Sequence, residues 1–484
     1  MMYLLIAIIA ALAVLFAVCF VRAVRIKGEH HDILQADPEK AGVSPEKCAA
    51  DLSEMIKIPT VSLIGVKDNT QIYKMHRRLE ELFPLIHKSL EKTDIDGALL
   101  FRWKGKNSSL NPILLMSHMD VVEALGSWKY PAFSGTVADG KIYGRGAIDT
   151  KGALCAILEG VEYLLAEGFV PERDIYIASS NNEEITGDGA VKTVEYLYEK
   201  GIRLDLVMDE GGAVMTGGAN MMDCGCAMVG IFEKGRANIR FTARSHGGHA
   251  SVPFKDSPFS RLSRLIYRLE TKSPFKKKLT KPVREMFHAM APHMAFKYRF
   301  LYANTWLFGP LLAKIMGKMG GKPNALVSTT CVFTMASGSH GANIIPQEAS
   351  VTANFRFMIH ENLTESFKKI GKAAKKLRLE VEMLAGYDCC KPADKNCYAY
   401  NYVNSSIRKN FGEIPVIPYV MLAGTDARHY TKICDCVLRF VPIIMTNEQF
   451  ASAHAIDENI SVSSLARAAA FYKDFIKNYD KGEA

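Results

Sequence analysis

The sequence predicts an α/β protein with a mainly parallel sheet, a second, smaller domain and one N-terminal transmembrane helix. Short apolar runs at 113–116, 174–180 and 204–208 alternate with helical patterns, which indicates βαβ units and a parallel sheet. The 484 residues exceed what one hydrophobic core usually organises, so we expect two domains and allow for one inserted in the other. Residues 1–21 carry no charged side chain and are long enough to cross a bilayer as a helix.

The apolar N-terminal segment is predicted to be an uncleaved anchor. A signal peptide normally begins with a positive region and ends at a small-x-small cleavage site, and this segment has neither, so we favour the anchor. Arg22, Arg25 and Lys27 follow at once, and the positive-inside rule then places the rest of the chain in the cytoplasm. We expect a single-pass membrane protein with its anchor over 1–24 and a polar linker over 25–46.

Composition and charge narrow the class of protein. Hydrophobic residues make up 48% of the chain and charged residues 23%, which is typical of a globular protein. The net charge is +9, but no nucleic-acid-binding signature accompanies it, so we expect no nucleic acid partner. A solvated basic surface, or one close to anionic lipid, explains the charge. Eleven cysteines without zinc-ribbon spacing favour reduced thiols and a cytosolic location.

The run 113–116 leads into a candidate functional site. His118 follows this run, and function in parallel sheets gathers where strands end. If the extended conformation persists, Asp120 points the same way, and its carboxylate can accept the free ring N–H of the imidazole. Asp149 lies in a glycine-rich turn before a helical pattern. The simpler alternatives are a buried histidine held by an aspartate, and an aspartate that caps a helix.

The next two predicted strands also end in acidic residues. Glu183-Glu184 follow the run 174–180, and Asp209-Glu210 follow the run 204–208. Adjacent carboxylates repel one another and are costly to gather unless something positive holds them. The alternative is that these residues are merely exposed acids of loops. With His118, three successive strands end in an imidazole or a carboxylate, which favours a metal site.

Taken together, these motifs resemble those of the di-zinc aminoacylase and carboxypeptidase family, especially its carboxypeptidase S-like branch. The resemblance runs from Cys48 to the C-terminus and agrees in order, spacing and residue types, although Asn181-Asn182 stand where many relatives have an acidic residue. It implies a mainly parallel-sheet di-zinc catalytic domain over 47–232 and 376–484. A smaller α+β lid domain would be inserted between these parts, over 233–375.

The same resemblance implies two zinc ions per chain. Glu183 would be the general base, and Asp120 would orient one of the ligands. Zinc accepts imidazole and carboxylate ligands, and two neighbouring ions make a bridging hydroxide available near neutral pH. Five ligands are implied: His118 and Asp209 on one ion, Glu184 and His454 on the other, and Asp149 between the two.

Residues of the lid and of a later loop are expected to contact the substrate. His249 resembles the histidine that donates to the substrate's oxyanion, in many relatives across a dimer interface, so a homodimer through the lid domain is one option. His246 is interpreted as a polar loop residue, and Asp426 as a support for its loop. Four further positions resemble the family's substrate contacts: Asn343, Arg356, Gly424 and Thr425.

Residues 271–323 depart from the compact lid of simpler relatives. A run of three lysines, 276–278, precedes a stretch rich in methionine, phenylalanine, tyrosine and tryptophan. Two interpretations stay open for this insertion. It could be amphipathic and lie on the membrane or wall the substrate cleft, or it could pack as the core of an enlarged lid.

The predicted function is a membrane-anchored zinc hydrolase of the carboxypeptidase or dipeptidase type. Its substrate would be a small peptide or an N-acyl amino acid, cleaved at an amide bond adjacent to a free carboxylate. The alternative within enzymes is an aminoacylase or N-acyl-amino-acid hydrolase. A catalytically silent binding protein is a third hypothesis, and it is disfavoured because all five implied ligands and Glu183 are present.

Overall fold

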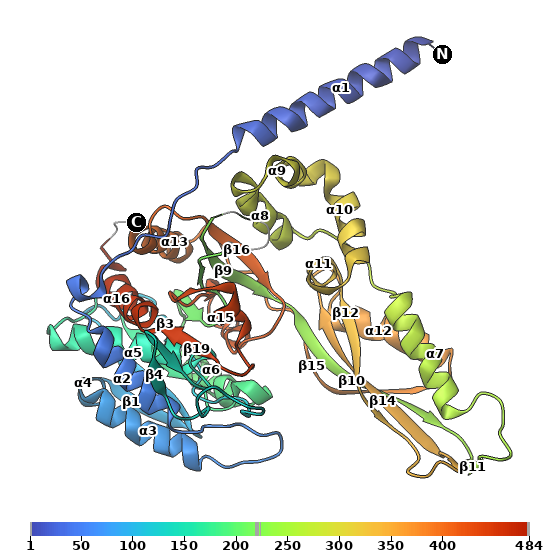
Figure 1. Cartoon of the computed structure of the whole chain (residues 1–484), viewed down its shortest axis with the longest axis horizontal. Helices are drawn as coiled ribbons and strands as arrows, with labels where there is room; N and C mark the ends of the chain where they lie inside the picture. Colours follow the sequence, from blue (N-terminus) through green and yellow to red (C-terminus); the bar gives the residue numbers. More distant parts are fainter. Residues whose placement is uncertain (1, 218–221, 223, 482–484) are drawn as a thin grey trace.

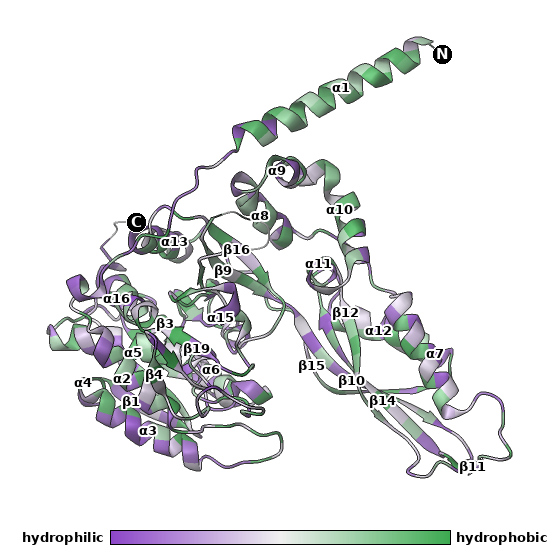
Figure 2. Cartoon of the chain, in the orientation of Figure 1, coloured by the Kyte–Doolittle hydropathy of each residue, from purple (hydrophilic) through white to green (hydrophobic). Residues whose placement is uncertain are grey.

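The computed structural model describes residues 2–217, 222 and 224–481 (Figure 1). It contains a ten-stranded sheet, a separate four-stranded sheet, and a long N-terminal helix that projects away from both. This helix, α1 (Met2–Arg25), is the one helix among the described residues that is long and apolar enough to cross a membrane. Most of its side chains are exposed and apolar (Figure 2).

The ten-stranded sheet is parallel at its centre. There β3 (Ile113–Met116) lies between β6 (Ile175–Ser179) and β7 (Leu206–Asp209), and β17 (Val437–Arg439) continues the parallel order beside β7. This confirms the predicted α/β class with a mostly parallel central sheet. The remaining strands are β1 (Glu91–Ile95), β2 (Ala98–Trp103), β8 (Val214–Met215), β9 (Cys226–Glu233), β16 (Val416–Met421) and β18 (Ile444–Met445).

Helices bury the apolar faces of this sheet. In α5 (Lys151–Ala166) nearly every residue is buried, and α5 packs against α16 (Val462–Asn478) and α2 (Pro45–Ile56). The all-apolar β3 is buried along its whole length, as a strand covered on both faces must be. The other elements of this domain are α3 (Thr70–Leu82), α4 (Pro84–Ser89), α6 (Gly189–Glu199), α13 (Tyr398–Phe411), α14 (Ala427–Tyr430) and α15 (Asn447–Ala451), with a small sheet of β4 (Thr136–Ala138), β5 (Lys141–Tyr143) and β19 (Asn459–Ser461).

The four-stranded sheet is antiparallel and has its own core. Its order is β12 (Thr330–Ser337), β14 (Glu348–Phe357), β10 (Gly235–Arg244) and β15 (Glu380–Tyr387), covered by α7 (Pro258–Thr271) and α12 (Leu363–Lys375). β11 (Gly248–His249) pairs with β13 (Ile344–Ile345) at one tip. The expected boundary at residue 375 leaves out β15, which belongs to this sheet. Most of the side chains of β15 are exposed, so its sequence carries no buried-strand pattern.

The insertion packs on the larger domain rather than inside the smaller one. It forms α8 (Lys281–Met290), α9 (Phe296–Ala303), α10 (Thr305–Met319) and α11 (Gly321–Val327). α8 lies against β16, and its buried residues Val283, Phe287 and Met290 join the core of the ten-stranded sheet. The hypothesis that the insertion is the core of an enlarged lid is therefore wrong, because an apolar helix face does not specify which domain it covers.

The segment between α1 and α2 runs along the surface of the larger domain. The Gly28 N–H donates to the Pro292 carbonyl at 3.0 Å, and the Leu34 N–H donates to the Phe411 carbonyl at 2.9 Å. A short 3₁₀ helix, Pro38–Ala41, follows, and Ser44 caps α2 by accepting from the Lys47 N–H at 3.2 Å. The expected polar linker is thus tied to the domain at several points.

Candidate metal centre

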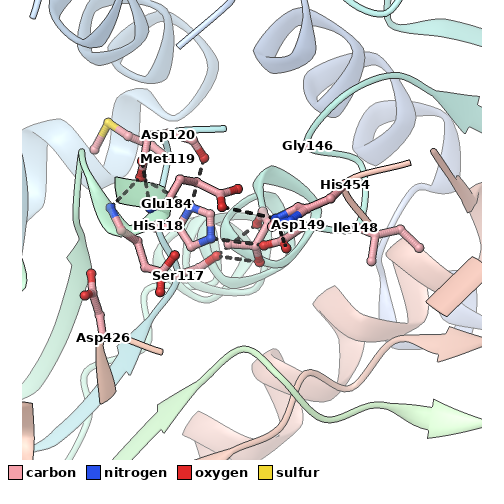
Figure 3. Close-up of polar contacts among 12 residues, drawn as sticks. Ser117, His118, Met119, Asp120, Gly146, Ile148, Asp149, Glu184, Asp426 and His454 are labelled. Atoms are coloured by element: carbon pink, nitrogen blue, oxygen red, sulfur yellow. Dashed lines mark hydrogen bonds and ion pairs between the residues drawn. The ribbon is translucent and has the colours of Figure 1, made fainter. Parts of the chain in front are cut away.

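Two histidines and two carboxylates from distant parts of the chain meet at one edge of the large sheet (Figure 3). Asp149 lies between the histidines. One of its oxygens is 3.0 Å from His118 Nε2, and the other is 3.0 Å from His454 Nε2. Glu184 Oε2 lies 3.1 Å from the same nitrogen of His454. Four of the five side chains that the family resemblance implies as ligands therefore converge.

Strand ends and the turns after them position these side chains. His118 follows β3, and Glu184 follows the neighbouring strand β6 in a short 3₁₀ helix. Asp149 lies two residues before α5 begins, and His454 lies in a turn after α15 with a left-handed φ of 62°. Because β3 and β6 are parallel neighbours, their carboxyl ends lie at the same edge of the sheet.

Asp120 acts through its backbone as well as its side chain. His118 Nδ1 lies 2.8 Å from the Asp120 carbonyl oxygen and 3.4 Å from the Asp120 carboxylate. The carboxylate accepts the backbone N–H groups of Glu183 at 3.1 Å and Glu184 at 3.2 Å. The sequence interpretation assumed an extended chain after β3, but β3 ends at Met116. Asp120 thus orients the imidazole and also fixes the turn that carries both glutamates.

Glu458 holds the loop that carries Asp149, and sequence analysis assigned it no role. It is fully buried and accepts from Arg145 at 2.6 Å, from the Ile148 N–H at 2.7 Å and from the Asp149 N–H at 3.0 Å. Removing this carboxylate would take away the ion pair of a buried guanidinium and leave three backbone donors, including the Gly146 N–H, without this acceptor. Glu458 lies four residues after His454, and this proximity is the one feature of the sequence that points to it. No local pattern indicates that its partners lie more than 300 residues away.

Asp209, the fifth predicted ligand, ends β7 beside this group. Its Oδ2 accepts the Ala427 N–H at 2.9 Å. Its Oδ1 and the Glu184 Oε1 are both buried and have no hydrogen-bond partner among the described residues. Burial raises the pKa of Asp209 above its usual range. Unpaired buried carboxylate oxygens are costly, so this edge of the sheet is suited to a bound cation.

The donor set fits zinc. Two imidazole nitrogens and several carboxylate oxygens are the ligands that catalytic zinc sites use. Asp149 directs one oxygen toward each histidine, as a carboxylate shared by two ions would. The buried, unpaired oxygens of Asp209 and Glu184 offer further donor atoms to such ions.

Glu183 lies beside the ligands. Its backbone is held by Asp120, and no partner of its carboxylate occurs among the hydrogen bonds and ion pairs of the described residues. Burial, reinforced by neighbouring carboxylates such as Asp426, raises the pKa of Glu183 well above its usual range. A carboxyl group whose pKa is raised toward the operating pH is better suited to proton transfer than an ordinary carboxylate.

Three arginines gather where the small sheet meets the larger domain. Arg236 donates to Thr186 Oγ1 at 3.0 Å, two residues beyond Glu184. Arg428 stacks over the Tyr387 ring at 4.6 Å, and its Nε and Nη2 are buried without a hydrogen-bond partner among the described residues. Burial, together with the nearby Arg236 and Arg428, lowers the pKa of Arg356. The family resemblance points to Arg356, whereas no local pattern in the sequence indicates Arg428.

The loop 424–426 contains two of the predicted substrate contacts, Gly424 and Thr425, and they differ in whether their polar groups already have partners. Thr425 is buried, and its N–H and hydroxyl donate to Glu233 at 2.9 and 2.7 Å, so these groups already have partners. Gly424 lies against the Tyr387 hydroxyl and near Arg428, one of the three arginines. Asp426 accepts from Ser180 at 2.5 Å and supports the loop, as expected; burial raises its pKa to about 6.

The structure does not bring His249 and Asn343 to the metal ligands. Both are exposed at the tip of the small sheet, where the Asn343 carbonyl accepts the Ala250 N–H at 2.9 Å (Figure 1). His249 Nδ1 lies 2.7 Å from Ser251 Oγ. His246 lies against the Phe254 ring, with centroids 4.5 Å apart. A contact between His249 and a substrate at the metal centre would require domain closure or a second chain.

Comparison with known proteins identifies the family. Residues 114–478 match the profile of Peptidase family M20/M25/M40. The chain belongs to this family. It is 33% identical over 453 residues to the Dictyostelium discoideum "Probable carboxypeptidase S-like 2", covering 91% of this chain and 86% of the relative. It is 32% identical over 491 residues to the Xenopus tropicalis "N-fatty-acyl-amino acid synthase/hydrolase PM20D1". This match covers 99% of this chain and 95% of the relative.

Solved structures of low sequence identity share the fold of this M20-family chain. A metallo-carboxypeptidase from Sulfolobus solfataricus superposes with a TM-score of 0.66 at 20% identity, covering 89% of this chain and 99% of that one. Human carnosine dipeptidase 1 superposes with a TM-score of 0.65 at 15% identity. This match covers 92% of this chain and 99% of that one. Family membership and the donor cluster together confirm the predicted zinc-dependent metallo-hydrolase of amide bonds.

Proposed function

We propose that the protein is a membrane-anchored hydrolase that cleaves a peptide or N-acyl amide bond adjacent to a free carboxylate. The arginine group of Arg236, Arg356 and Arg428 carries this proposal. It joins the turn that holds Glu184 through the Arg236–Thr186 hydrogen bond. Arg428 has two buried nitrogens, Nε and Nη2, without a hydrogen-bond partner among the described residues, although Nη2 lies 4.0 Å from Asp426 Oδ1. Planar guanidinium groups bind a carboxylate with paired hydrogen bonds, so a substrate carboxylate is the natural occupant.

The proposed metal assignment is the one that the family resemblance implies. His118 and Asp209 would hold one zinc ion, Glu184 and His454 would hold the other, and Asp149 would be shared by both. The 3.0 Å approach of each Asp149 oxygen to a different histidine supports this division. Bound zinc would polarise the scissile carbonyl and lower the pKa of a water molecule toward neutrality.

Glu183 is proposed as the general base. It takes a proton from the attacking water as the water oxygen bonds to the carbonyl carbon. It returns that proton to the amine nitrogen as the C–N bond breaks. Its raised pKa and the support of its backbone by Asp120 favour this role.

His249 and Asn343 are proposed to join the site after a movement. Their exposure at the tip of the small sheet leaves them free to approach a substrate when this sheet, acting as a lid, closes, or to enter the site of a second chain in a homodimer. In either case the His249 imidazole would donate to the oxyanion that forms on the scissile carbonyl.

Two substrate classes meet these requirements. Dipeptides carry the free carboxylate and the amide bond, and N-acyl amino acids carry the same two groups. The membrane helix favours the second class, because fatty-acyl amino acids partition into bilayers, and a relative of this kind matches 99% of the chain. The deciding experiment compares kcat/KM for dipeptides and for N-acyl amino acids of increasing chain length, before and after zinc removal. Hydrolysis of neither class by the zinc-loaded protein would reject the proposal.

A further inference from the structure

The N-terminal helix is docked onto the insertion through its last turns. Phe16 and Phe20 of α1 face Phe300 and Phe296 of α9, with ring centroids 5.6 and 5.4 Å apart. Asn304 donates to the Cys19 carbonyl at 3.0 Å. Cys19 and Ala23 are buried in this contact, whereas the preceding turns of α1 are exposed. The insertion therefore has a fixed depth relative to a membrane that α1 enters.

This depth follows from helix geometry. Arg22 is the first charged residue of the chain and marks where α1 reaches the headgroups. Phe16 lies six residues earlier, about 9 Å along the axis at about 1.5 Å per residue. Interfacial helices bury their apolar faces about 5–10 Å into the boundary between headgroups and acyl chains. The ring of Phe300, in contact with Phe16, lies at that boundary.

The free face of α10 is a broad exposed side that is mostly apolar. Trp306, Leu311, Ile315 and Met319 are 51%, 54%, 47% and 67% exposed, whereas Leu312 and Met316 join the large core. Trp306 lies at one edge of this free face, because about two and a half helical turns separate it from Ile315. Figure 1 shows α10 crossing the direction of α1, as a helix lying in a membrane plane would. Lys314 and Lys318 are exposed within this face and can extend their charges to the headgroups.

Apart from Glu285, all the charged residues of the insertion are basic. Between Glu285 and Glu348 the chain contains no aspartate or glutamate, but it contains Lys297, Arg299, Lys314, Lys318 and Lys322. At the base of α1, a cavity of about 360 Å³ is lined by Arg22, Arg25 and His288, with Ile26, Pro292 and Ala303. A cavity that joins guanidinium groups to apolar walls suits a lipid phosphate and its glycerol.

We propose that α9 and α10 dock on the anionic leaflet that α1 enters. The apolar face of α10 lies at the headgroup boundary, and its lysines, Arg22 and Arg25 bind phospholipid phosphates. This surface goes beyond the hydrolase activity and rests on the proposal that α1 is an uncleaved anchor. The bonds of Gly28 and Leu34 to the larger domain then hold that domain at one height above the bilayer.

Trp306 provides a direct test, because the chain has three tryptophans and Trp306 lies on the free face. The full-length protein is placed in nanodiscs of phosphatidylcholine and phosphatidylserine that carry bromine near the headgroup end of the acyl chains. Bromine should quench part of the emission of the wild type and of W128F, and this quenching should be lost in W306F. Equal quenching in W306F and the wild type would overturn the proposal.

A charge variant tests the lipid specificity. K314E/K318E should reduce quenching in anionic nanodiscs, whereas the matched exposed pair K372E/K376E, which has the same spacing near the end of α12, should not. If each nanodisc holds two copies of the protein and Trp306 is shielded from bromine, the proposal of lipid docking is rejected. The free face of α10 would then be covered by a second copy of the chain. Failure to enter nanodiscs would overturn the anchor and the docking together. Hydrolysis of a water-soluble substrate in the same samples reports separately on the metal centre.

Discussion

Single residues at the metal centre have separable roles, and Glu183 is the clearest case because it lies beside the ligands without a partner of its own among the described residues. Glu183→Gln should keep two zinc ions per chain and lose roughly 10²–10⁴-fold in kcat, since proton transfer is lost while the ligands remain. Metal analysis and steady-state kinetics on the same preparation check this. Loss of zinc in the variant would show that Glu183 is itself a ligand.

Asp149 should be the most sensitive ligand. Its two oxygens approach different histidines, so Asp149→Ala removes a donor from both proposed ions, whereas His454→Ala removes a donor from one. We expect Asp149→Ala to abolish activity and to lower the zinc content more than His454→Ala does. Plasma mass spectrometry of dialysed protein measures this. An active Asp149→Ala with two bound ions would refute the shared-carboxylate arrangement.

The arginine group should set the requirement for a substrate carboxylate. Amidating that carboxylate should cost the wild type about 2 kcal/mol or more in kcat/KM, because a guanidinium is left unpaired. Arg356→Lys should lower kcat/KM for the free acid and narrow this difference, since lysine cannot form paired hydrogen bonds. Arg240→Lys, on an exposed part of the same sheet, is the control. Equal hydrolysis of acid and amide by the wild type would exclude a carboxylate clamp.

Three of the five predicted ligands lie at or shortly after a strand end. His118 follows β3, Glu184 lies in the turn after β6, and Asp209 ends β7, so their arrival at one edge follows from the parallel sheet. Asp149 and His454 lie in turns, and their ligand roles are implied by the family resemblance alone. Glu458 and Arg428 were missed because their roles depend on contacts with Asp149 and Tyr387, which no local pattern encodes. Thr425 is predicted to contact the substrate, but its backbone N–H already donates to the Glu233 carboxylate.

At the scale of elements, the contact between α5 and α16 depends on a glycine. A Cβ on Gly160 would lie 2.9 Å from Tyr472 Cβ and 3.0 Å from the Ala469 carbonyl oxygen. Gly160→Ala should therefore destabilise the protein by about 1–3 kcal/mol through overpacking. The control is Gly371→Ala in α12, where a Cβ meets nothing within 4 Å; it should be neutral or stabilise by up to about 1 kcal/mol. Urea unfolding compares them, and equal midpoints for the two variants would contradict the packing argument.

Elements were predictable where burial imposes a pattern. The central strands and α5 have continuous apolar or helical periodicity, and they occur where expected. β15 has mostly exposed side chains and was placed outside the small sheet. The insertion was recognised from its composition, but its attachment to β16 was not, because an apolar face of α8 fits any complementary surface.

At the scale of the whole molecule, the orientation in the membrane follows from the charges that flank α1. Arg22, Arg25 and Lys27 directly follow it, and from the positive-inside rule we predict that the hydrolase domain lies in the cytoplasm. The buried thiols of Cys48, Cys155 and Cys434 form no disulfide, which agrees with a reducing compartment.

Protease protection measures this orientation. In sealed cells, an external protease should leave the domain beyond Lys27 intact, and detergent permeabilisation should expose it to digestion. A variant with Arg22, Arg25 and Lys27 changed to glutamine and three lysines added before Leu4 should invert, because the excess of basic residues then precedes the helix. Digestion of the wild-type domain in sealed cells would show that the domain faces outward and that the flanking charges do not set its orientation.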